Sequence, residues 1–361
     1  MAGSNFSVSD AANCTDLYYH RSTARVLMPL AYAIVSPLGL LGNALALHVI
    51  LSNRAKINST TLYSANLVVS DILFSLSLPL RAVYYGLGFH WPMGETLCKI
   101  TALLFYVNTY SGVNFMTCLA VDRFVAIVLP LRLSKLRKVK NVRYVCLAVW
   151  LVVLAQTLPL LGMPMTHREP DGTVTCMEYP NFERHVEGLP YMLIGAVVLG
   201  YGIPVMTILG CYSLLVFRLR LAEKGNQLTE RSGRSRKAMG VIAGVVLVFL
   251  VCFSPYHLDI LQFMVRKLFY ETSCDELRAF QVSLHVTVCL MNLNACLDPF
   301  VYFFACKGYK KKILQMMKLQ MSTSFSSAGR TSHDSSCPRD ARGGDGRHST
   351  RVHLNSIKNS P

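Results

Sequence analysis

Charged residues are scarce in this sequence, and the shortage excludes an ordinary water-soluble protein. They make up 16% of the 361 residues, whereas hydrophobic residues make up 52%, and the mean hydropathy is positive at +0.36. A soluble globular domain typically has about a quarter charged residues. Because so little polar surface cannot cover a soluble body of this size, the composition predicts a membrane protein.

Acidic residues are scarcer still, since 20 Asp and Glu stand against 36 Lys and Arg, for a formal net charge of +16. Such an excess favours nucleic-acid binding only when the basic residues form a stripe interleaved with exposed aromatic residues. Here they lie between apolar runs and in the tail. We therefore expect no nucleic-acid partner.

Seven apolar runs are long enough to cross a bilayer core of roughly 30 Å, which needs about 20 helical residues. They occupy residues 27–51, 61–86, 96–129, 142–163, 189–217, 238–265 and 280–304. A spanning segment must satisfy its own backbone hydrogen bonds, so each run is expected to be helical. The predicted fold class is all-α, a seven-transmembrane helix bundle.

The distribution of Lys and Arg predicts the orientation, because cytoplasmic loops are enriched in both. The loops after the first, third and fifth spans are basic, whereas residues 86–97 contain neither residue. We expect an extracellular amino terminus, a cytoplasmic carboxyl terminus and a multi-pass location in the plasma membrane. The first 25 residues are polar, so no cleavable signal peptide is expected and the first span would direct insertion.

The predicted organisation has an extracellular segment (1–26), a seven-helix transmembrane domain (27–305), an amphipathic membrane-surface helix (306–319) and a disordered cytoplasmic tail (320–361). Asn5 and Asn13 begin glycosylation sequons in the outer segment, whereas the sequon at Asn58 is cytoplasmic and should stay bare. A hydroxyl cluster in the tail is a candidate for receptor kinases and arrestin, although a plain flexible tail explains it as well. It comprises Ser322, Thr323, Ser324, Ser326 and Ser327.

The twelve cysteines divide by compartment. Cys14, Cys98, Cys176 and Cys274 lie on the expected outer side, where disulfides persist. Four cysteines allow three pairings, and we expect Cys98–Cys176 and Cys14–Cys274. The other eight are expected to be small apolar residues or free thiols, and lipidation of Cys306 or Cys337 stays open.

Short motifs fall on the predicted spans in a fixed order. They are Gly42-Asn43 in the first span, Asn66 and Asp71 in the second, Asp122-Arg123-Phe124 ending the third, Trp150 in the fourth, Pro204 and Tyr212 in the fifth, Cys252-Phe253-Ser254-Pro255 in the sixth, and Asp298-Pro299-Phe300-Val301-Tyr302 ending the seventh. With Cys98 and Cys176, this set resembles the rhodopsin-like (class A) family of G-protein-coupled receptors over residues 25–318. The resemblance implies a receptor that signals to a cytoplasmic G protein and is not an enzyme.

Arg123 can pair with Asp122 while the bundle is closed and then face a partner when the sixth helix swings outward, a switch between two states roughly a few kcal/mol apart. A simple charge pair at the membrane interface is the alternative. The resemblance assigns further activation roles to Phe253, Pro255, Tyr212, Asp298, Pro299 and Tyr302. Three positions differ from the residues that are usual in the family: Phe124 replaces a tyrosine, Phe253 a tryptophan and Asp298 an asparagine. These differences affect the expected details of activation and not the expectation that the receptor is activated.

Asp71 lies deep in the predicted membrane, where a carboxylate needs a cation or a proton. Asn43, Asn294 and Asp298 are expected nearby. In similar receptors a sodium ion occupies such a site, so the possible metal ligand is Asp71 with these three residues. A protonated carboxyl group in a polar network is the alternative, and no other cofactor is expected.

Missing residues also narrow the ligand class. The seventh span contains no lysine, which excludes a retinal Schiff base there. Phe105 stands where amine receptors have an aspartate, and Val288 stands where many chemokine receptors have an acid. The expected cavity is aromatic with few neutral polar groups, which suits a hydroxylated lipid. Its expected residues are Tyr106, Asn108, Tyr110, Tyr256, His257 and Asn292.

Arg81 stands alone near the outer end of the second span, about 15 Å above Asp71 by helix rise. Its five donors could hold a ligand hydroxyl or anion, or its side chain could extend to the membrane surface. Tyr106 and Tyr110 lie four residues apart on one helical face and could line the same cavity or merely pack. We expect His48 and His285 to be ordinary bundle residues, and leave a pocket role for His257 open.

Longer stretches are similar to the oxysterol receptors of this family. They are KINSTTLYS (56–64), VNTYSGVNFMTCLAVDRF (107–124), AQTLPLL (155–161), TCMEYPNFE (175–183) and FFACKGYK (303–310). The resemblance implies a dihydroxycholesterol agonist such as 7α,25-dihydroxycholesterol, an inhibitory-class G protein and control of immune-cell migration. It places Arg81, Tyr106, Tyr110 and Tyr256 against the sterol, with Asn108 and Glu178 close by.

Three other classes of protein remain as alternatives. A receptor for another lipid or a chemokine-like peptide would share the fold, and a decoy receptor would bind a ligand without coupling. The intact Asp122-Arg123 pair disfavours a decoy. A transporter or membrane enzyme is disfavoured because the spans show no inverted repeat and no nucleophile or metal-ligand constellation.

Overall fold

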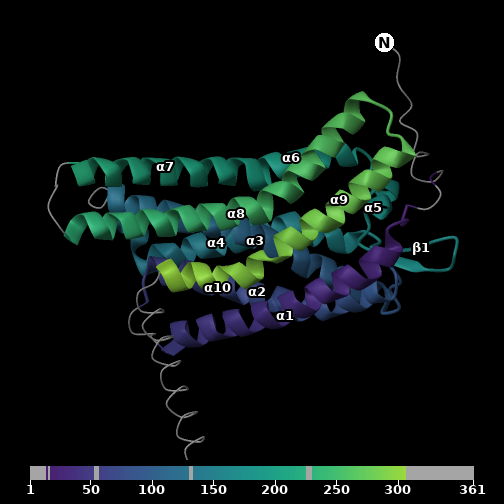
Figure 1. Ribbon diagram of the computed structural model, residues 1–361, viewed down its shortest axis with the longest axis horizontal. Helices are drawn as coiled ribbons and strands as arrows, with labels where there is room; N and C mark the ends of the chain where they lie inside the picture. The colour runs from purple at the N-terminus through teal and green to yellow at the C-terminus, as the bar shows by residue number, and fades with distance from the viewer. Residues whose placement is uncertain (1–13, 15–16, 53–56, 130–132, 225–229, 306–361) are drawn as a thin grey trace, which may run out of the picture. The chain divides into compact units, whose positions relative to one another are not determined.

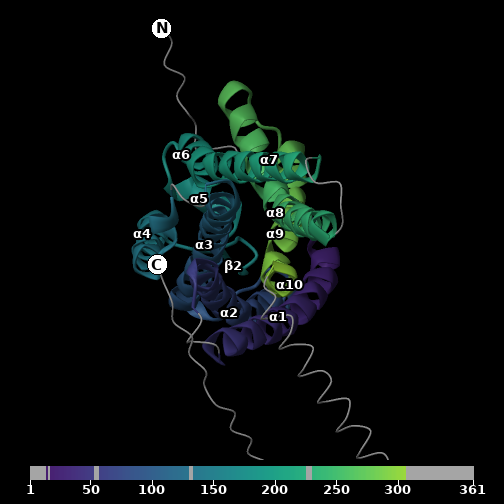
Figure 2. The same cartoon turned by 90° about the vertical axis from the view of Figure 1, so that its left-hand side faces the viewer.

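Seven helical spans pack side by side in the computed structural model of the chain (Figures 1 and 2). The structure describes residues 14, 17–52, 57–129, 133–224 and 230–305, all within the first of two units, Met1–Ile313. Several predictions therefore lie outside the described residues. They are the surface helix at 306–319, the tail with its phosphorylation cluster, the sequons at Asn5 and Asn13, and Cys306 and Cys337.

The spans are built from helices with the following bounds. They are α1 (Arg21–Ser52), α2 (Ser59–Gly86), α3 (Gly94–Val128), α4 (Val139–Thr157) with η3 (Leu158–Gly162), α6 (Leu189–Val197) with the π turn η4 (Val198–Gly202) and α7 (Ile203–Lys224), α8 (Glu230–Phe269), and α9 (Cys274–Asn292) with α10 (Asn294–Ala305). Each span is long and apolar enough to cross a membrane. The predicted all-α, seven-helix fold is confirmed.

The seventh span begins earlier than the predicted residue 280 because the start of α9 has a complete capping box. The Ser273 hydroxyl accepts a hydrogen bond from the Glu276 amide, and the Glu276 carboxylate accepts one from the Ser273 amide. These bonds satisfy amides that would otherwise have no helical partner. The polar segment 274–279, which apolar periodicity missed, is therefore helical.

Prolines within the spans leave carbonyl groups that side chains of α1 satisfy. A proline has no amide hydrogen for the carbonyl four residues earlier, so Pro79 and Pro299 leave the carbonyl oxygens of Ser75 and Ala295 without their usual partners. The Ser36 hydroxyl donates to Ser75 O at 2.9 Å, and the Asn43 amide donates to Ala295 O at 2.7 Å. These bonds explain why two polar residues of α1 are buried against α2 and α10.

The π turn η4 coincides with another proline. Pro204 cannot donate to the carbonyl of Gly200, and the helix bulges by one residue at this point. A Cβ atom on Gly200 would lie 2.8 Å from the Tyr110 ring of α3, which is closer than real Cβ contacts. The bulge and the missing side chain together allow α3 to approach the fifth span.

The end of the bundle that contains the first turn of α1 is held by both disulfides, and we call it the disulfide end. Cys98–Cys176 and Cys14–Cys274 are formed, with Cα atoms 5.9 and 5.5 Å apart, which confirms the predicted pairing. The connection between the fourth and fifth spans covers this end with the antiparallel strands β1 (Thr166–Arg168) and β2 (Val174–Cys176), followed by α5 (Tyr179–His185).

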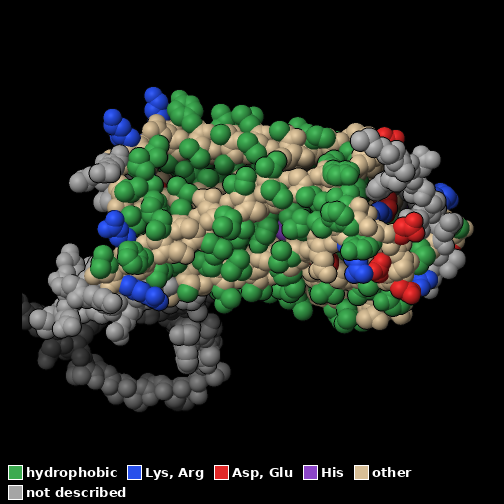
Figure 3. Space-filling view, turned by 90° about the horizontal axis from the view of Figure 1, so that it is seen from above, with side chains coloured by type: hydrophobic (Ala, Val, Ile, Leu, Met, Phe, Trp, Pro, Cys, Tyr) green, Lys and Arg blue, Asp and Glu red, His purple; other side chains and the backbone are tan. Residues whose placement is uncertain are grey.

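The opposite end, which we call the basic end, has the short 3₁₀ turn η2 (Ser134–Arg137) between α3 and α4. In Figure 3 blue Lys and Arg side chains project there, whereas the red Asp and Glu side chains in view gather at the disulfide end. Between the two ends the surface in view is mostly green hydrophobic side chains. A surface of this kind suits lipid rather than water.

Candidate binding cavity and the rhodopsin receptor family

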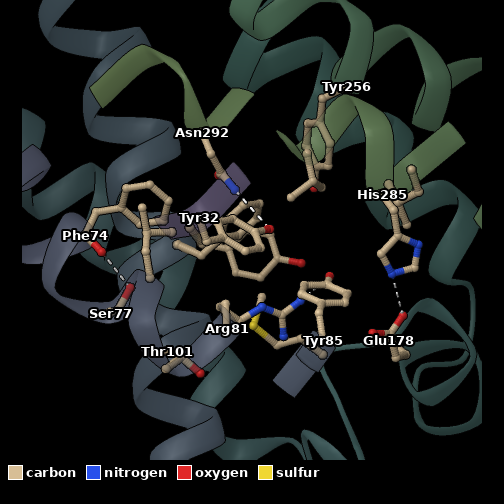
Figure 4. Close-up of a pocket in the computed structure, with 16 residues that line it drawn as sticks. Tyr32, Phe74, Ser77, Arg81, Tyr85, Thr101, Glu178, Tyr256, His285 and Asn292 are labelled. Atoms are coloured by element: carbon tan, nitrogen blue, oxygen red, sulfur yellow. Dashed lines mark hydrogen bonds and ion pairs between the residues drawn. The ribbon is translucent and has the colours of Figure 1, made fainter. Parts of the chain in front are cut away.

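A buried cavity of about 70 Å³ lies in the disulfide half of the bundle. Residues of α1, α2, α3, α8 and α9 line it, and Met177 and Glu178, between β2 and α5, also contribute (Figure 4). Most of its walls are aromatic or aliphatic, which agrees with the kind of cavity that the sequence predicts. Ligand cavities typically measure about 300–1,000 Å³, so this cavity is contracted.

Arg81 is the central polar residue of the cavity and does not extend to the surface. One guanidinium nitrogen donates to the Cys176 carbonyl at 3.1 Å, and the other donates to the Tyr85 hydroxyl at 2.9 Å. The guanidinium carbon also lies 4.9 Å from the ring centre of Tyr84. The sequence suggested that Arg81 stands alone. In the structure it has polar partners, because the disulfide-bonded loop folds back onto it.

Glu178 places a buried negative charge on the same wall, with 3% of its surface exposed. Tyr84 donates to one carboxylate oxygen at 2.8 Å, and Nε2 of His285 lies 3.4 Å from the other. Burial raises the pKa of Glu178, but the positive charge and hydrogen bond of His285, the charge of Arg81 and the Tyr84 hydroxyl outweigh it. The pKa therefore lies below its ordinary value, and Glu178 is a carboxylate at neutral pH.

His285 corrects one expectation, because it is a member of the cavity wall rather than an ordinary bundle residue. Its ring also packs against Tyr85 and Phe89 (Figure 4 shows Tyr85). Tyr32 of α1 is a second residue that the sequence did not single out, and its hydroxyl accepts a hydrogen bond from Asn292 at 3.3 Å. No local motif marks His285 or Tyr32, because the partner of each lies in a distant part of the chain: Glu178 for His285 and Asn292 for Tyr32.

The aromatic wall of the cavity contains Tyr106 and Tyr256, which the sequence places in the cavity, and also Phe105. The Phe105 ring centre lies 5.1 Å from that of Tyr106 and 6.3 Å from that of Tyr256. Tyr256 is on α8, so a ligand in this cavity would contact the helix that contains Phe253 and Pro255, which the sequence predicts to take part in activation.

Three expected cavity residues lie elsewhere. Asn108 is a turn deeper, where its amide donates to Asp71 at 2.8 Å. Tyr110 packs against Gly200 of the bulge, and His257 stacks on Tyr201 with ring centres 4.3 Å apart. None of the three lines the cavity, because the helix positions that face it are set by interhelical packing, which spacing within one helix does not reveal.

The residues around Asp71 form a buried cluster of oxygen atoms that suits a small cation. Asp71 and Asp298 are fully buried, and Asn294 donates to Asp298 at 3.2 Å. Buried oxygens of Asn43, Asp71, Ser75, Asn294 and Asp298 have no hydrogen-bond partner among the described residues. Carboxylate, amide and hydroxyl oxygens are ligands of hard cations. The four predicted ligands are thus compatible with a sodium ion, and Ser75 would be a fifth.

The structure corrects the expected Asp122–Arg123 pair at the basic end. Asp122 instead accepts from Arg137 of η2 at 2.8 Å and from the Thr60 hydroxyl at 2.8 Å. Arg123 lies near Tyr212, which is buried. Asp122 therefore fixes the loop after the third span, and Arg123 is not its ion-pair partner among the described residues.

Of the other residues that the sequence predicts to take part in activation, Phe253 and Pro299 are buried. Phe253 is 1% exposed, and a Cβ atom on Gly112 would lie 3.1 Å from its ring. Pro255 lies in α8 and Pro299 in α10. Tyr302 is helical, and its side chain lies outside the described part of the structure.

A family model described as 7 transmembrane receptor (rhodopsin family) matches residues 42–302. The chain belongs to this family. The receptor is 68% identical to G-protein coupled receptor 183-B of Danio rerio over 99% of this chain and 96% of that protein. It is 54% identical to human G-protein coupled receptor 183 over 89% of each chain, and 31% identical to the human uracil nucleotide/cysteinyl leukotriene receptor over 87% of this chain and 82% of that protein.

These relatives establish the general activity of the receptor. It is a G-protein-coupled receptor with a G protein as its partner and is not an enzyme. Its seven apolar spans agree with a multi-pass membrane protein.

Proposed function

We propose that this receptor lies in the plasma membrane with its disulfide end outside and responds to a hydroxylated sterol. Binding would activate an inhibitory-class G protein, direct immune-cell migration and lead to arrestin recruitment after phosphorylation by receptor kinases. The sequence similarity to oxysterol receptors supports the sterol class. The physical observation that carries the proposal is the pair of opposite charges, Arg81 and Glu178, on one wall of an otherwise apolar cavity.

A neutral hydroxyl suits this pair better than a charged group does. A hydroxyl both donates and accepts, so its oxygen can accept from the Arg81 guanidinium while its hydrogen is donated to the Glu178 carboxylate. An anionic ligand group would face the Glu178 charge, and an ammonium group would face Arg81, in a region where charges are weakly screened. A sterol ring system would fill the aromatic remainder of the cavity.

The cavity must widen to admit a sterol, and the protein offers two ways. Met177 is a non-glycine residue with φ of 62° at the roof, a backbone conformation that costs about 1–3 kcal/mol and favours rearrangement. Tyr256 lines the cavity and is close enough to Tyr110 to interact with it electrostatically. A shift of Tyr256 would therefore extend the cavity toward Tyr110 and displace α8, which couples binding to activation.

Binding of tritiated 7α,25-dihydroxycholesterol to membranes that contain the receptor tests the proposal. Arg81→Ala is expected to weaken binding by roughly 10- to 100-fold, because a hydrogen bond to a charged group contributes about 1.5–3 kcal/mol. Arg266→Ala is the matched control, since this arginine pairs with Glu276 outside the cavity and its loss should leave binding unchanged. Cholesterol, which lacks the two extra hydroxyls, should not compete.

A G-protein activation assay across oxysterols, lysolipids, uracil nucleotides and chemokines separates the ligand classes. Activation by oxysterol that pertussis toxin abolishes would support the inhibitory class. Activation by a peptide alone would overturn the sterol assignment and leave the receptor fold intact.

A further inference from the structure

The two ring nitrogens of His285 face two acceptors. Nδ1 lies 2.6 Å from the backbone oxygen of Gln281, one helical turn earlier in α9. Nε2 lies 3.4 Å from a carboxylate oxygen of Glu178 (Figure 4). A carbonyl oxygen can only accept, so Nδ1 must carry a hydrogen, and a neutral ring would then turn the lone pair of Nε2 toward the carboxylate.

Two lone pairs facing each other would repel in this buried position, where His285 is 5% and Glu178 3% exposed. A hydrogen on both nitrogens removes the repulsion and makes a charge-assisted pair. The arrangement therefore suits an imidazolium. With a neutral His285, the Glu178 carboxylate would keep Tyr84 as its one direct side-chain donor among the residues that the structure describes.

We propose that His285 is a positioning residue of the ligand cavity, and that its protonated form holds the Glu178 carboxylate in place for the ligand hydroxyl. The inference rests on the proposed function, since it concerns how the same site recognises its ligand. His285 fixes one carboxylate oxygen and Tyr84 fixes the other. The remaining lone pairs of Glu178 are then available on the cavity wall beside Arg81.

The groups that face His285 come from three other parts of the chain. His20, just before α1, has its ring centre 5.2 Å away, Tyr85 of α2 has its ring centre 5.6 Å away, and Glu178 comes from the loop. Arg81 and Tyr84 act on the same carboxylate. Tyrosine and arginine keep their protons near neutral pH, and the pKa of Glu178 is below its ordinary value, so these neighbouring groups keep their charge across the neutral range.

The His285–Glu178 pair determines whether ligand affinity rises or falls with pH. A histidine that gains a carboxylate partner stabilises the folded arrangement while it is protonated, and this contribution disappears as pH rises and the ring loses its proton. An oxysterol has no titratable group, so any change in its affinity between about pH 6 and pH 8.5 must come from the receptor. Affinity should fall as the pH rises.

The experiment measures the dissociation constant of tritiated 7α,25-dihydroxycholesterol across this range for the full-length receptor in lipid nanodiscs. We expect the wild type to lose about tenfold in affinity toward alkaline pH, and His285→Gln to bind weakly with no pH dependence. His20→Gln is the matched control and should keep the wild-type slope. A slope that persists in His285→Gln, or that disappears only in His20→Gln, would overturn the proposal.

A second measurement without ligand separates this proposal from the assignment of the ligand. Hydrogen exchange of the segment 174–179 in the ligand-free receptor reports how firmly the loop is held. Exchange should speed up with pH beyond the intrinsic chemical rate in the wild type, and should already be fast in His285→Gln. If the oxysterol binds neither the wild-type receptor nor the variants, the proposed function fails. The hydrogen-exchange comparison of the wild type with His285→Gln then decides the role of His285. Equal exchange rates of this segment in the wild type and in His285→Gln would refute the positioning role of His285.

Discussion

Charged and polar residues buried in the bundle obtain partners from other spans, and this decides what each of them does. Asp122 is the clearest case at the basic end. Its carboxylate pairs with Arg137 across the loop after the third span and with Thr60 of α2. The neighbouring Arg123 lies near Tyr212 instead. In this state Asp122 of the motif therefore restrains a loop and does not pair with Arg123.

We predict that Arg137→Gln lowers agonist-stimulated nucleotide exchange by roughly fivefold. Without Arg137, the Asp122 carboxylate can turn to the adjacent Arg123 and withhold it from the G protein. The arginine is partly exposed, so the pair contributes only about 1 kcal/mol. A guanosine nucleotide exchange assay checks this, with Lys140→Gln, an exposed position in the first turn of α4, as control. An exchange rate in Arg137→Gln equal to that of the control would contradict the role of the pair.

Helices of this receptor approach closely where glycine meets proline. A Cβ atom on Gly42 of α1 would lie 2.9 Å from Cγ and 3.3 Å from Cβ of Pro299 in α10. Pro299 also leaves the Ala295 carbonyl free, and Asn43, the next residue of α1, satisfies it. The Gly42-Asn43 motif therefore gives α1 both the space and the hydrogen bond that its contact with α10 requires.

Gly42→Ala should destabilise the receptor by about 1–3 kcal/mol, because the stiff proline ring cannot move aside and the helices must separate. Gly210→Ala in α7 is the control, since a Cβ atom there meets nothing within 4 Å and alanine favours a helix. Thermal unfolding in detergent should show a lower melting temperature for Gly42→Ala and an equal or higher one for Gly210→Ala. The reverse order would show that this helix contact tolerates a methyl group.

Across the whole molecule, the two disulfides have different roles. Cys14–Cys274 joins residues 260 apart in sequence, and Cys98–Cys176 joins residues 78 apart. The second bond also places functional groups, since the Cys176 carbonyl accepts from Arg81 and Glu178 follows two residues later. Neither Cys14 nor Cys274 is among the described residues that line the cavity, so the contribution of the first bond is expected to be to stability.

Replacing Cys14 and Cys274 together with serine should lower stability by about 2–4 kcal/mol and leave oxysterol affinity within a few-fold of the wild type. Replacing Cys98 and Cys176 in the same way should abolish binding, because Glu178 and the Cys176 carbonyl lose their positions. Thermal unfolding and sterol binding on both double variants check this. Normal sterol affinity without the Cys98–Cys176 bond would rule out a positioning role for it.

The sequence by itself determined the features that depend on local composition. The seven apolar runs, with the receptor motifs on them, can be recognised because a bilayer imposes helical spans of fixed length. The four disulfide cysteines can be recognised because they lie on the expected outer side, where disulfides persist. Arg81, Tyr106, Tyr256 and Glu178 were singled out correctly as residues close to one cavity. Boundaries such as the start of α9 were missed, since a capping box in a polar segment leaves no apolar period.

Only the tertiary structure decided which residues meet across the bundle. It paired Asp122 with Arg137, turned Asn108 toward Asp71 and Tyr110 toward the bulge at Gly200, and joined His285 to Glu178. Each contact joins segments far apart in the chain. Its geometry depends on how helices rotate and approach one another, which is set by the packing of all the spans together and not by spacing within any one of them.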